Sequence, residues 1–277
     1  MAVQLTLDKK EYLLGDTVRA TVTVTNDGAA AVSVPKPELC MPSVSFRLLR
    51  NPDAATPESI VTRLGPEAGT VKLEPGKSVS GLIEFPAIEA HGLMIEALYN
   101  PRGRAHPHFV NTQVETSNRV AFHVKSGGKK LRAKFSTEAG EFAAEFYPER
   151  AHNHVLSFVQ LAQKGYFNGI KFHRVVPSFV IQGGDPTGTG SGGPGYRMPS
   201  EFNEILHEPG VLSMARTSDP HSAGSQFFVC TARTPHLDNQ YTVFGRVVSG
   251  LDAVMKIGAS ADNAGRFSMK KVELVLE

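Results

Sequence analysis

Apolar and polar residues alternate along most of the first 125 positions. One clear run is VRATVTV (18–24), which ends at the turn sequence NDG (26–28). A period of two is typical of strands with one buried face, and turn residues separate the runs. The pattern therefore predicts an antiparallel β-sandwich over residues 1–125, without a convincing helix. Comparable runs occupy residues 3–7, 44–48, 79–85, 93–99 and 120–124.

This half is similar to the immunoglobulin-like modules of multidomain proteins, although no motif in it identifies a family. It ends at KSGGKK (125–130), which is polar and contains paired glycines. Such a composition is typical of a short linker, which we place at residues 126–130. The chain has 277 residues, and a chain of this length is usually too long to fold around a single hydrophobic core. We therefore expect a second domain at residues 131–277.

A helix is predicted early in the second domain. Apolar residues from Val155 to Ala162 recur at positions i, i+3, i+4 and i+7, which is the spacing of one helix face. Asn153 is the expected N-cap, and Gly165 is expected to end the helix.

Strands make up most of the rest of this domain, starting with LRAKF (131–135) and FAAEF (142–146). A short helix is predicted near its end, at residues 249–257, where Ser249 and Asp252 have the spacing of a capping box. Two helices among many strands predict a closed β-barrel capped by helices.

Charge and composition exclude several functions. The 29 basic and 27 acidic residues give a net charge of +2, and no run of like charges occurs. No apolar stretch has the length of a signal peptide or a membrane span. We expect a cytoplasmic monomer that binds neither nucleic acid nor a membrane. Cys40 and Cys230 lie far apart in the chain, so no disulfide framework is predicted.

One strand carries an unusual charge. FHRVVPSFVIQGGD (172–185) is apolar and β-branched, yet it contains Arg174 and Gln182. Taken alone, the run favours an edge strand whose arginine points to water.

Two long motifs in the second half occur together, and in this order, in one protein family. FHRVVPSFVIQGGDPTGTGSGGPG (172–195) and GVLSMARTSDPHSAGSQFFVCTARTPHLDNQYTVFG (210–245) resemble those of cyclophilins, the peptidyl-prolyl cis-trans isomerases. The resemblance runs from Leu131 to Glu277 and covers none of the first 125 residues. It implies an eight-stranded β-barrel capped by two helices, with no cofactor and no metal.

The reaction of this family explains why an arginine is needed. The isomers of an X-Pro bond differ little in energy but are separated by about 20 kcal/mol of amide resonance. A fixed positive donor stabilises the twisted amide more than the planar one, and arginine is always charged and planar. The resemblance implies that Arg174 is this donor, that Gln182 hydrogen-bonds the arginine and the substrate, and that Phe179 lines the pocket for the proline ring.

The resemblance also implies further substrate contacts, and some of these positions depart from the family pattern. His236 stands where well-studied members have a tryptophan that contacts cyclosporin, so weak cyclosporin binding is expected. Tyr241 stands where histidine is frequent, and Arg216 where asparagine is common. The implied substrate-binding residues are Val180, Gly190, Ala215, Arg216, Gln226, Phe228, His236, Leu237 and Tyr241.

Two other patterns have simpler explanations. GTGSGG (188–193) fits the glycine pattern of dinucleotide sites, but a proline follows where a helix should begin, so we expect a loop. The histidine pairs His106 with His108 and His152 with His154 lack a third ligand in the sequence nearby, and we assign them no metal.

The sequence therefore predicts a peptidyl-prolyl cis-trans isomerase that acts on proline-containing peptides and unfolded protein clients and assists folding. The N-terminal sandwich is expected to bind clients or partners. The alternative is a proline-peptide binding module in which catalysis is incidental. In a third interpretation the sandwich is the main functional part and the isomerase is an accessory.

Overall fold

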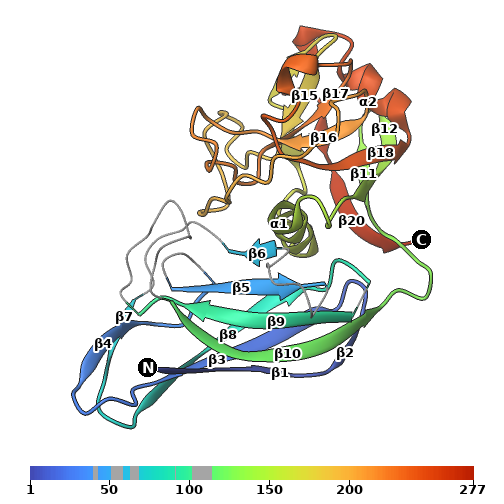
Figure 1. The fold of residues 1–277 in the computed structure, drawn as a ribbon. Helices are drawn as coiled ribbons and strands as arrows, with labels where there is room; N and C mark the ends of the chain where they lie inside the picture. Colours follow the sequence, from blue (N-terminus) through green and yellow to red (C-terminus); the bar gives the residue numbers. More distant parts are fainter. Residues whose placement is uncertain (40–42, 51–58, 63–68, 91, 102–113) are drawn as a thin grey trace. The chain divides into compact units, whose positions relative to one another are not determined.

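The computed structural model describes residues 1–39, 43–50, 59–62, 69–90, 92–101 and 114–277. The chain divides into two compact units, residues 1–126 and 127–277 (Figure 1). Cys40, His106 and His108 lie outside the described residues.

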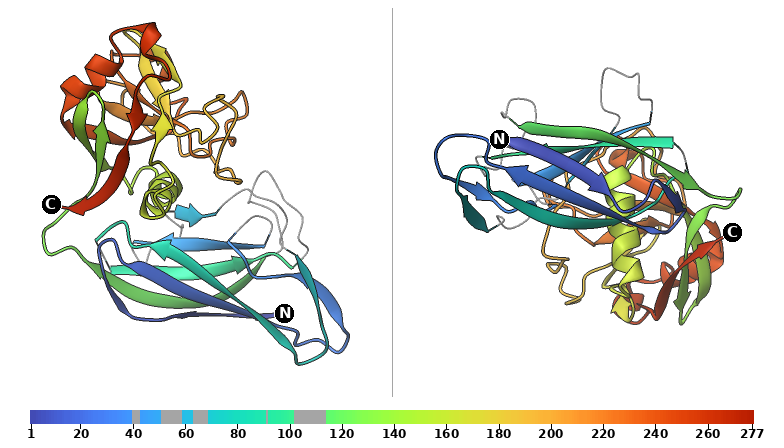
Figure 2. Two further views of the ribbon diagram at one scale, coloured as in Figure 1. Left: turned by 180° about the vertical axis from the view of Figure 1, so that it is seen from behind. Right: turned by 90° about the horizontal axis from the view of Figure 1, so that it is seen from below.

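Strands make up the described secondary structure of the first unit, in two layers (Figures 1 and 2). One layer has the strand order β1-β3-β8, the other has the order β2-β10-β9-β5-β6, and β4 pairs with β7. The bounds are β1 (Ala2–Leu7), β2 (Glu11–Leu13), β3 (Thr17–Thr25), β4 (Val32–Pro35), β5 (Val44–Leu49), β6 (Ser59–Val61), β7 (Thr70–Leu73), β8 (Ser78–Pro86), β9 (Gly92–Tyr99) and β10 (Glu115–Lys125).

The alternation seen in the sequence forms the core of this unit. The four apolar residues of VRATVTV in β3 are fully buried, and the residues between them are not. Phe46 of β5 contacts Phe85 of β8, with ring centroids 5.7 Å apart, so the two layers share one core. Burying a side chain of this size contributes roughly 1.5–3 kcal/mol.

One strand pair departs from the predicted antiparallel pattern. β2 pairs with the end of β10 in parallel, with Glu11 opposite His123. The chain passes from β1 in one sheet to β2 in the other, and β2 thereby lies beside the last strand of the unit. A period of two describes a strand's faces but not its direction, so the sequence could not predict this pair.

The second unit contains one sheet of eight strands, the number in the barrel that the resemblance implied, and the two predicted α-helices. The sheet has the order β14-β15-β17-β16-β18-β12-β11-β20, and each of these pairs is antiparallel. The helices are α1 (His152–Gln163) and α2 (Leu251–Ile257), with short 3-10 turns η2 (Pro235–Leu237) and η3 (Ala261–Asn263). The strands are β11 (Leu131–Thr137), β12 (Gly140–Phe146), β13 (Ile170–Lys171), β14 (Arg174–Val176), β15 (Val180–Gly183), β16 (Val211–Met214), β17 (Phe227–Cys230), β18 (Val243–Ser249), β19 (Ser268–Met269) and β20 (Lys271–Leu276).

The start of α1 differs from the prediction. The helix begins at His152, and Asn153 lies inside it rather than at its N-cap. Glu201, which is 48 residues further on, accepts hydrogen bonds from the backbone N–H groups of Asn153 (3.0 Å) and His154 (3.1 Å). A distant carboxylate thus replaces the expected local cap. The predicted end is confirmed, because the helix stops at Gln163 and Gly165 is left-handed with φ of 68°.

The start of α2 also differs. Ser249 belongs to β18, and the helix begins at Leu251 after Gly250, whose φ is 72°. No side chain caps this helix start. A Cβ at Gly250 would lie 2.1 Å from the carbonyl oxygen of Glu141, so this tight turn requires glycine where a capping box was expected.

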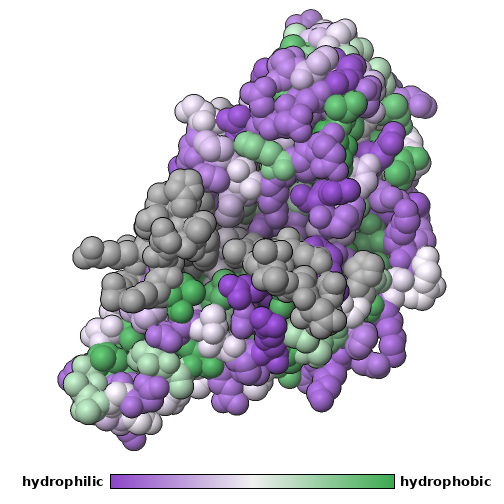
Figure 3. Space-filling view, viewed as in Figure 1, coloured by the Kyte–Doolittle hydropathy of each residue, from purple (hydrophilic) through white to green (hydrophobic). Residues whose placement is uncertain are grey.

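The surface of the second unit is largely hydrophilic on the face shown in Figure 3. None of the helices described in the structure is both long and apolar enough to cross a membrane.

Candidate active site

A β-hairpin positions the arginine identified in the sequence. β14 and β15 pair so that Arg174 lies opposite Gln182, and Gln182 lies opposite Phe228 of β17 on its other side. The turn between the strands includes Ser178, whose φ of 55° is unusual for a residue with a Cβ. The next residue, Phe179, contacts the guanidinium of Arg174 at 5.8 Å from the ring centroid.

A chain of hydrogen bonds orients the arginine. Gln226 Nε2 donates to the carbonyl oxygens of Gly190 and Gly192, both at 2.9 Å, so its Oε1 must face the other way. That oxygen accepts from Gln182 Nε2 at 3.0 Å, and Gln182 Oε1 accepts from Arg174 Nη1 at 3.3 Å. Each amide has one orientation that satisfies both neighbours, and the chain ends on fixed backbone carbonyls.

These hydrogen bonds do not neutralise the charge of Arg174. Its side chain is exposed, and among the described residues no carboxylate forms an ion pair with it. Its contacts are a neutral amide oxygen and an aromatic ring. A held but unpaired guanidinium is available to a ligand at this surface.

An apolar cluster lies beside the arginine. The margin of this cluster is formed by partly buried residues that pack against the cluster, among them Phe179, Ala215 and Tyr241. The ring of Tyr241 meets that of Phe228 edge to face, with centroids 5.9 Å apart. The residues of the cluster itself are at most 7% exposed, so the accessible apolar surface is formed mainly by this margin, which is suited to an apolar ring such as that of proline. The cluster consists of Val180, Val211, Phe228, Cys230, Leu237 and Val243.

The remaining predicted substrate residues lie in or beside this cluster. Val180 is only 1% exposed, so its contribution to the surface is packing from within. Leu237 belongs to η2, and its neighbour His236 stacks on Phe179 with ring centroids 5.4 Å apart. Ala215 donates its backbone N–H to the carbonyl of Gln226 at 3.0 Å.

A buried polar network supports the cluster from behind, and the sequence analysis did not identify it. His207 is fully buried and stacks on Phe228, with ring centroids 6.0 Å apart. Its Nδ1 lies 3.1 Å from Asp238 Oδ1, and its Nε2 lies 3.0 Å from Ser213 Oγ. Burial lowers the pKa of His207, and Asp238 offsets this only in part. Asp238 also pairs with Arg233.

A glycine-rich loop borders the site on the side of Gln226. The carboxylate of Asp185 is 1% exposed and accepts backbone N–H groups of Thr187 (2.7 Å) and Gly190 (2.6 Å). These two N–H groups are therefore already bonded to Asp185 and are not free to bind a phosphate. This agrees with the expectation that GTGSGG is a loop and not a dinucleotide site. Gly190 has φ of 87°, a conformation that a Cβ would strain.

The structure brings together all the residues that the sequence implied for the site. They form one continuous set of contacts from Gly190 through Gln226, Gln182 and Arg174 to the apolar cluster. Arg216 joins this set through Tyr241, with its guanidinium 4.4 Å from the ring centroid. The arrangement combines one oriented positive charge with an apolar surface.

Residues 132–275 match the model of the family described as cyclophilin type peptidyl-prolyl cis-trans isomerase/CLD. A peptidyl-prolyl cis-trans isomerase of Synechococcus elongatus is 43% identical over 141 residues, which cover 51% of this chain and 95% of the relative. Peptidyl-prolyl cis-trans isomerase B of Bacillus subtilis is 50% identical over 110 residues, which cover 39% of this chain and 76% of the relative.

The crystal structure of a cyclophilin type isomerase of Cryptosporidium parvum, determined in the presence of the dipeptide Ala-Pro, matches with a TM-score of 0.49 and 28% identity. The match covers 52% of this chain and 98% of that one.

Proposed function

Because the chain belongs to the family of cyclophilin-type peptidyl-prolyl cis-trans isomerases, we propose that it isomerises X-Pro bonds at the surface formed by Arg174 and the apolar cluster. The substrates are proline-containing peptides and unfolded proteins. The hydrogen-bond chain that orients an unpaired Arg174 beside an apolar surface supports this proposal most directly.

The first requirement of the reaction is to hold the proline. Its ring would lie on the apolar cluster, between the margins formed by Phe179 and Tyr241. This contact is the same for the planar and the twisted amide, so it contributes to binding rather than to the rate of the chemical step. Phe228 has a rigid support, because His207 stacks beneath it.

The second requirement is to lower the barrier of about 18–20 kcal/mol to rotation about the C–N bond. Rotation breaks the amide resonance and leaves a lone pair on the proline nitrogen. A guanidinium donor stabilises that electron density more than it stabilises the planar amide. No covalent bond forms or breaks, and no proton leaves the enzyme.

The third requirement is preorganisation of the donor. A long arginine side chain in water would lose rotamer freedom on each binding event. Gln182 accepts a hydrogen bond from the guanidinium of Arg174 before substrate arrives, Gln226 orients Gln182, and the carbonyls of Gly190 and Gly192 orient Gln226. The side chain of Arg174 therefore loses its conformational entropy when the protein folds, and not each time a substrate binds.

The first unit lies outside the segment matched by the family model. We assign it the binding of client or partner proteins, which brings unfolded chains to the isomerase. This role is supported by its separate two-layer fold in the same chain as the isomerase unit.

The test is isomer exchange on a short X-Pro peptide, measured by NMR with the full chain and with Arg174→Ala. Loss of one preorganised donor should lower kcat/KM by about 10²- to 10³-fold. Arg174→Lys keeps the charge without the planar fork, and it should recover only part of the rate. The matched control is Arg150→Ala, which removes an exposed arginine paired with Glu204.

All three variants should melt within a few degrees of the parent, since neither arginine belongs to a core. An Arg174→Ala protein that melts and isomerises like the parent would contradict the mechanism. A parent that binds the peptide without accelerating exchange would leave the proline-peptide binding module as the function.

A further inference from the structure

A second arginine beside the site is held as firmly as the first. Arg216 donates from Nε and Nη2 to the carbonyl oxygen of Gln240 at 3.1 and 3.0 Å, and from Nη1 to that of Thr217 at 2.8 Å. Its guanidinium lies 4.4 Å from the ring centroid of Tyr241 and 5.7 Å from that of Phe202. A longer bond from Nη1 to the carbonyl oxygen of Ser218 at 3.5 Å adds a third acceptor, so two rings and three carbonyls fix its position at the surface.

The charge of Arg216 is not compensated. Its acceptors are neutral carbonyl oxygens, and no ion pair involves it in the described part of the chain. Asp219, in the turn that follows, instead accepts the backbone N–H of His221 at 2.9 Å. Arg174 is likewise unpaired, so the site carries two positive groups that lack a negative partner.

Other carboxylates near the site are already engaged. Asp185 accepts hydrogen bonds from its own loop, and Asp238 pairs with Arg233. Glu208 also pairs with Arg233, and Glu201 accepts from His154. None of these four carboxylates lies against Arg216, so its guanidinium is left to an anionic side chain of a ligand.

Arg216 lies within reach of a peptide on the cluster. It follows Ala215, which packs at the margin of the cluster, and it stacks on Tyr241, which packs at the same margin. A peptide whose proline covers the cluster must place neighbouring residues over this margin. A Glu or Asp side chain there would meet a guanidinium whose orientation is already fixed.

We propose that Arg216 is a specificity-determining residue that selects X-Pro substrates with a carboxylate side chain within two residues of the proline. The inference rests on the proposed isomerase function and deepens it. Exposed ion pairs are weak, so the preference for Glu over neutral Gln should be about two- to fivefold at low salt. Glutamine is the proper comparison, because it has the shape of glutamate without its charge.

The experiment uses the full chain and pentapeptides with a central proline. Glu or Gln is placed in turn at each of the two positions before and after the proline, and kcat/KM is measured by NMR exchange. The parent should prefer Glu at one position at least, and the preference should shrink as salt is added. Arg216→Gln should reduce the ratio at that position to about one, and Arg216→Glu should invert it.

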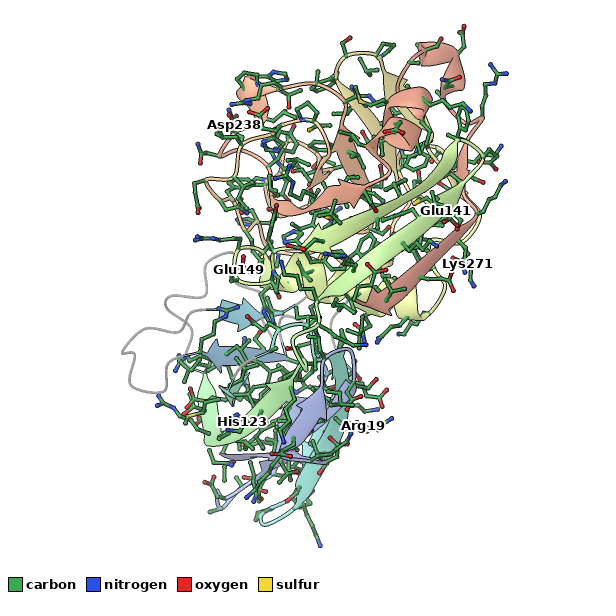
Figure 4. All side chains as sticks on the ribbon, turned by 90° about the vertical axis from the view of Figure 1, so that its right-hand side faces the viewer. Arg19, His123, Glu141, Glu149, Asp238 and Lys271 are labelled. Carbon is green, nitrogen blue, oxygen red and sulfur yellow. The ribbon has the colours of Figure 1, made fainter. Side chains whose placement is uncertain are left out.

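Two further variants separate charge from other effects. Arg216→Lys should keep part of the preference, since it keeps the charge but loses the fork and the stacking. Lys271→Gln removes one positive charge from β20, on the opposite side of the second unit from Asp238, which adjoins η2 (Figure 4). This control should keep the parental ratio, because the effect is local.

The outcomes distinguish this inference from the function on which it rests. Turnover of the Gln peptides with a Glu-to-Gln ratio near one at all four positions would overturn the role of Arg216 alone. A preference for Glu that survives in Arg216→Gln would overturn it as well. No acceleration of any peptide would overturn the proposed function and this inference together. Peptide affinities from NMR titration should show the same ratios as the rates, and equal affinities for Glu and Gln peptides would contradict a binding preference.

Discussion

At the residue scale, His236 shows how one side chain can alter an otherwise complete site. Its ring stacks on Phe179 at an interplanar angle of 26°, and Phe179 in turn contacts Arg174. An imidazole covers less apolar area than an indole and presents its donor at another place. The expected consequence is weak binding of large apolar ligands that extend over this ring.

We predict that cyclosporin inhibits the parent weakly and that His236→Trp lowers the inhibition constant by about tenfold, which is roughly 1.4 kcal/mol. Inhibition of peptide isomerisation measures the effect directly. His236→Phe is the control for apolar area without an indole N–H, and it should fall between the two. Strong inhibition of the parent, unchanged by His236→Trp, would show that this position does not control affinity.

The sequence located some site residues and missed others for a physical reason. Arg174 and Gln182 lie in one continuous motif, and the hairpin between them sets their register, so their contact follows from local structure. His207 and Asp238 are 31 residues apart in the sequence, and they lie in segments without a periodic pattern of hydrophobic residues. Only the folded chain brings such a pair together, and neither residue has a local signal that marks it.

At the element scale, the start of α1 depends on a residue from another segment. The carboxylate of Glu201 accepts from two backbone N–H groups of the first turn and lies 2.6 Å from His154 Nδ1. Burial would raise the pKa of Glu201, but hydrogen bonds from His154 and Asn153 lower it below its usual value. The sequence favoured Asn153 as the cap because capping preferences are local, and a cap supplied by the tertiary fold has no such signature.

Glu201→Ala should therefore lower the free energy of unfolding by about 2–4 kcal/mol, because it removes the cap and leaves buried donors unpaired. Urea unfolding followed by circular dichroism measures this change. Glu204→Ala is the matched control, since Glu204 is an exposed partner of Arg150 and should change stability little. Equal effects of the two substitutions would show that Glu201 is not the cap of α1.

The glycine-rich loop beside the site should confer sensitivity to acid. Burial would raise the pKa of Asp185, but hydrogen bonds from Thr187, Gly192 and Gly190 outweigh it and lower the pKa to about 2, from an ordinary value of 3.8. A carboxyl group with a lowered pKa stabilises the folded state above its unfolded pKa. This contribution is lost as the pH falls from about 4 towards 2.

Asp185→Asn should therefore lower Tm at neutral pH, and the difference from the parent should shrink between about pH 4 and pH 2. Calorimetry of the full chain across this range measures the difference. A difference that stays constant down to pH 2 would mean that the charge of Asp185 does not stabilise the loop.

At the scale of the whole molecule, the hydrophobic pattern identified the kinds of elements better than their connections. It predicted a strand-rich first half and a second half of many strands with two helices, because burial on one face depends on spacing along the chain. The number of eight strands came from the family resemblance. It could not show that β2 lies parallel to β10, nor the order of strands in either unit. Those features depend on which edges meet in three dimensions.

We predict that residues 129–277 fold alone and keep the turnover of the full chain on short peptides within about twofold. The compact division at residue 126 supports this prediction. Refolding of an unfolded protein client limited by proline isomerisation should be faster with the full chain than with the fragment. Equal rates on that client would remove the client-binding role from the first unit, and an unfolded fragment would contradict its independence.

The pairing of β11 with β20 has a consequence for the order of events during synthesis. Lys130 and Glu277 exchange two backbone hydrogen bonds, and Arg132 meets the Glu277 carboxylate across 145 residues of chain. β11, the first strand of this unit to be synthesised, therefore keeps one edge unpaired until β20, the last strand, has been synthesised. Closing so long a loop is slow compared with local pairing. The first unit can complete its sheets while the isomerase is still being made, whereas the isomerase completes its own sheet only after β20 has left the ribosome.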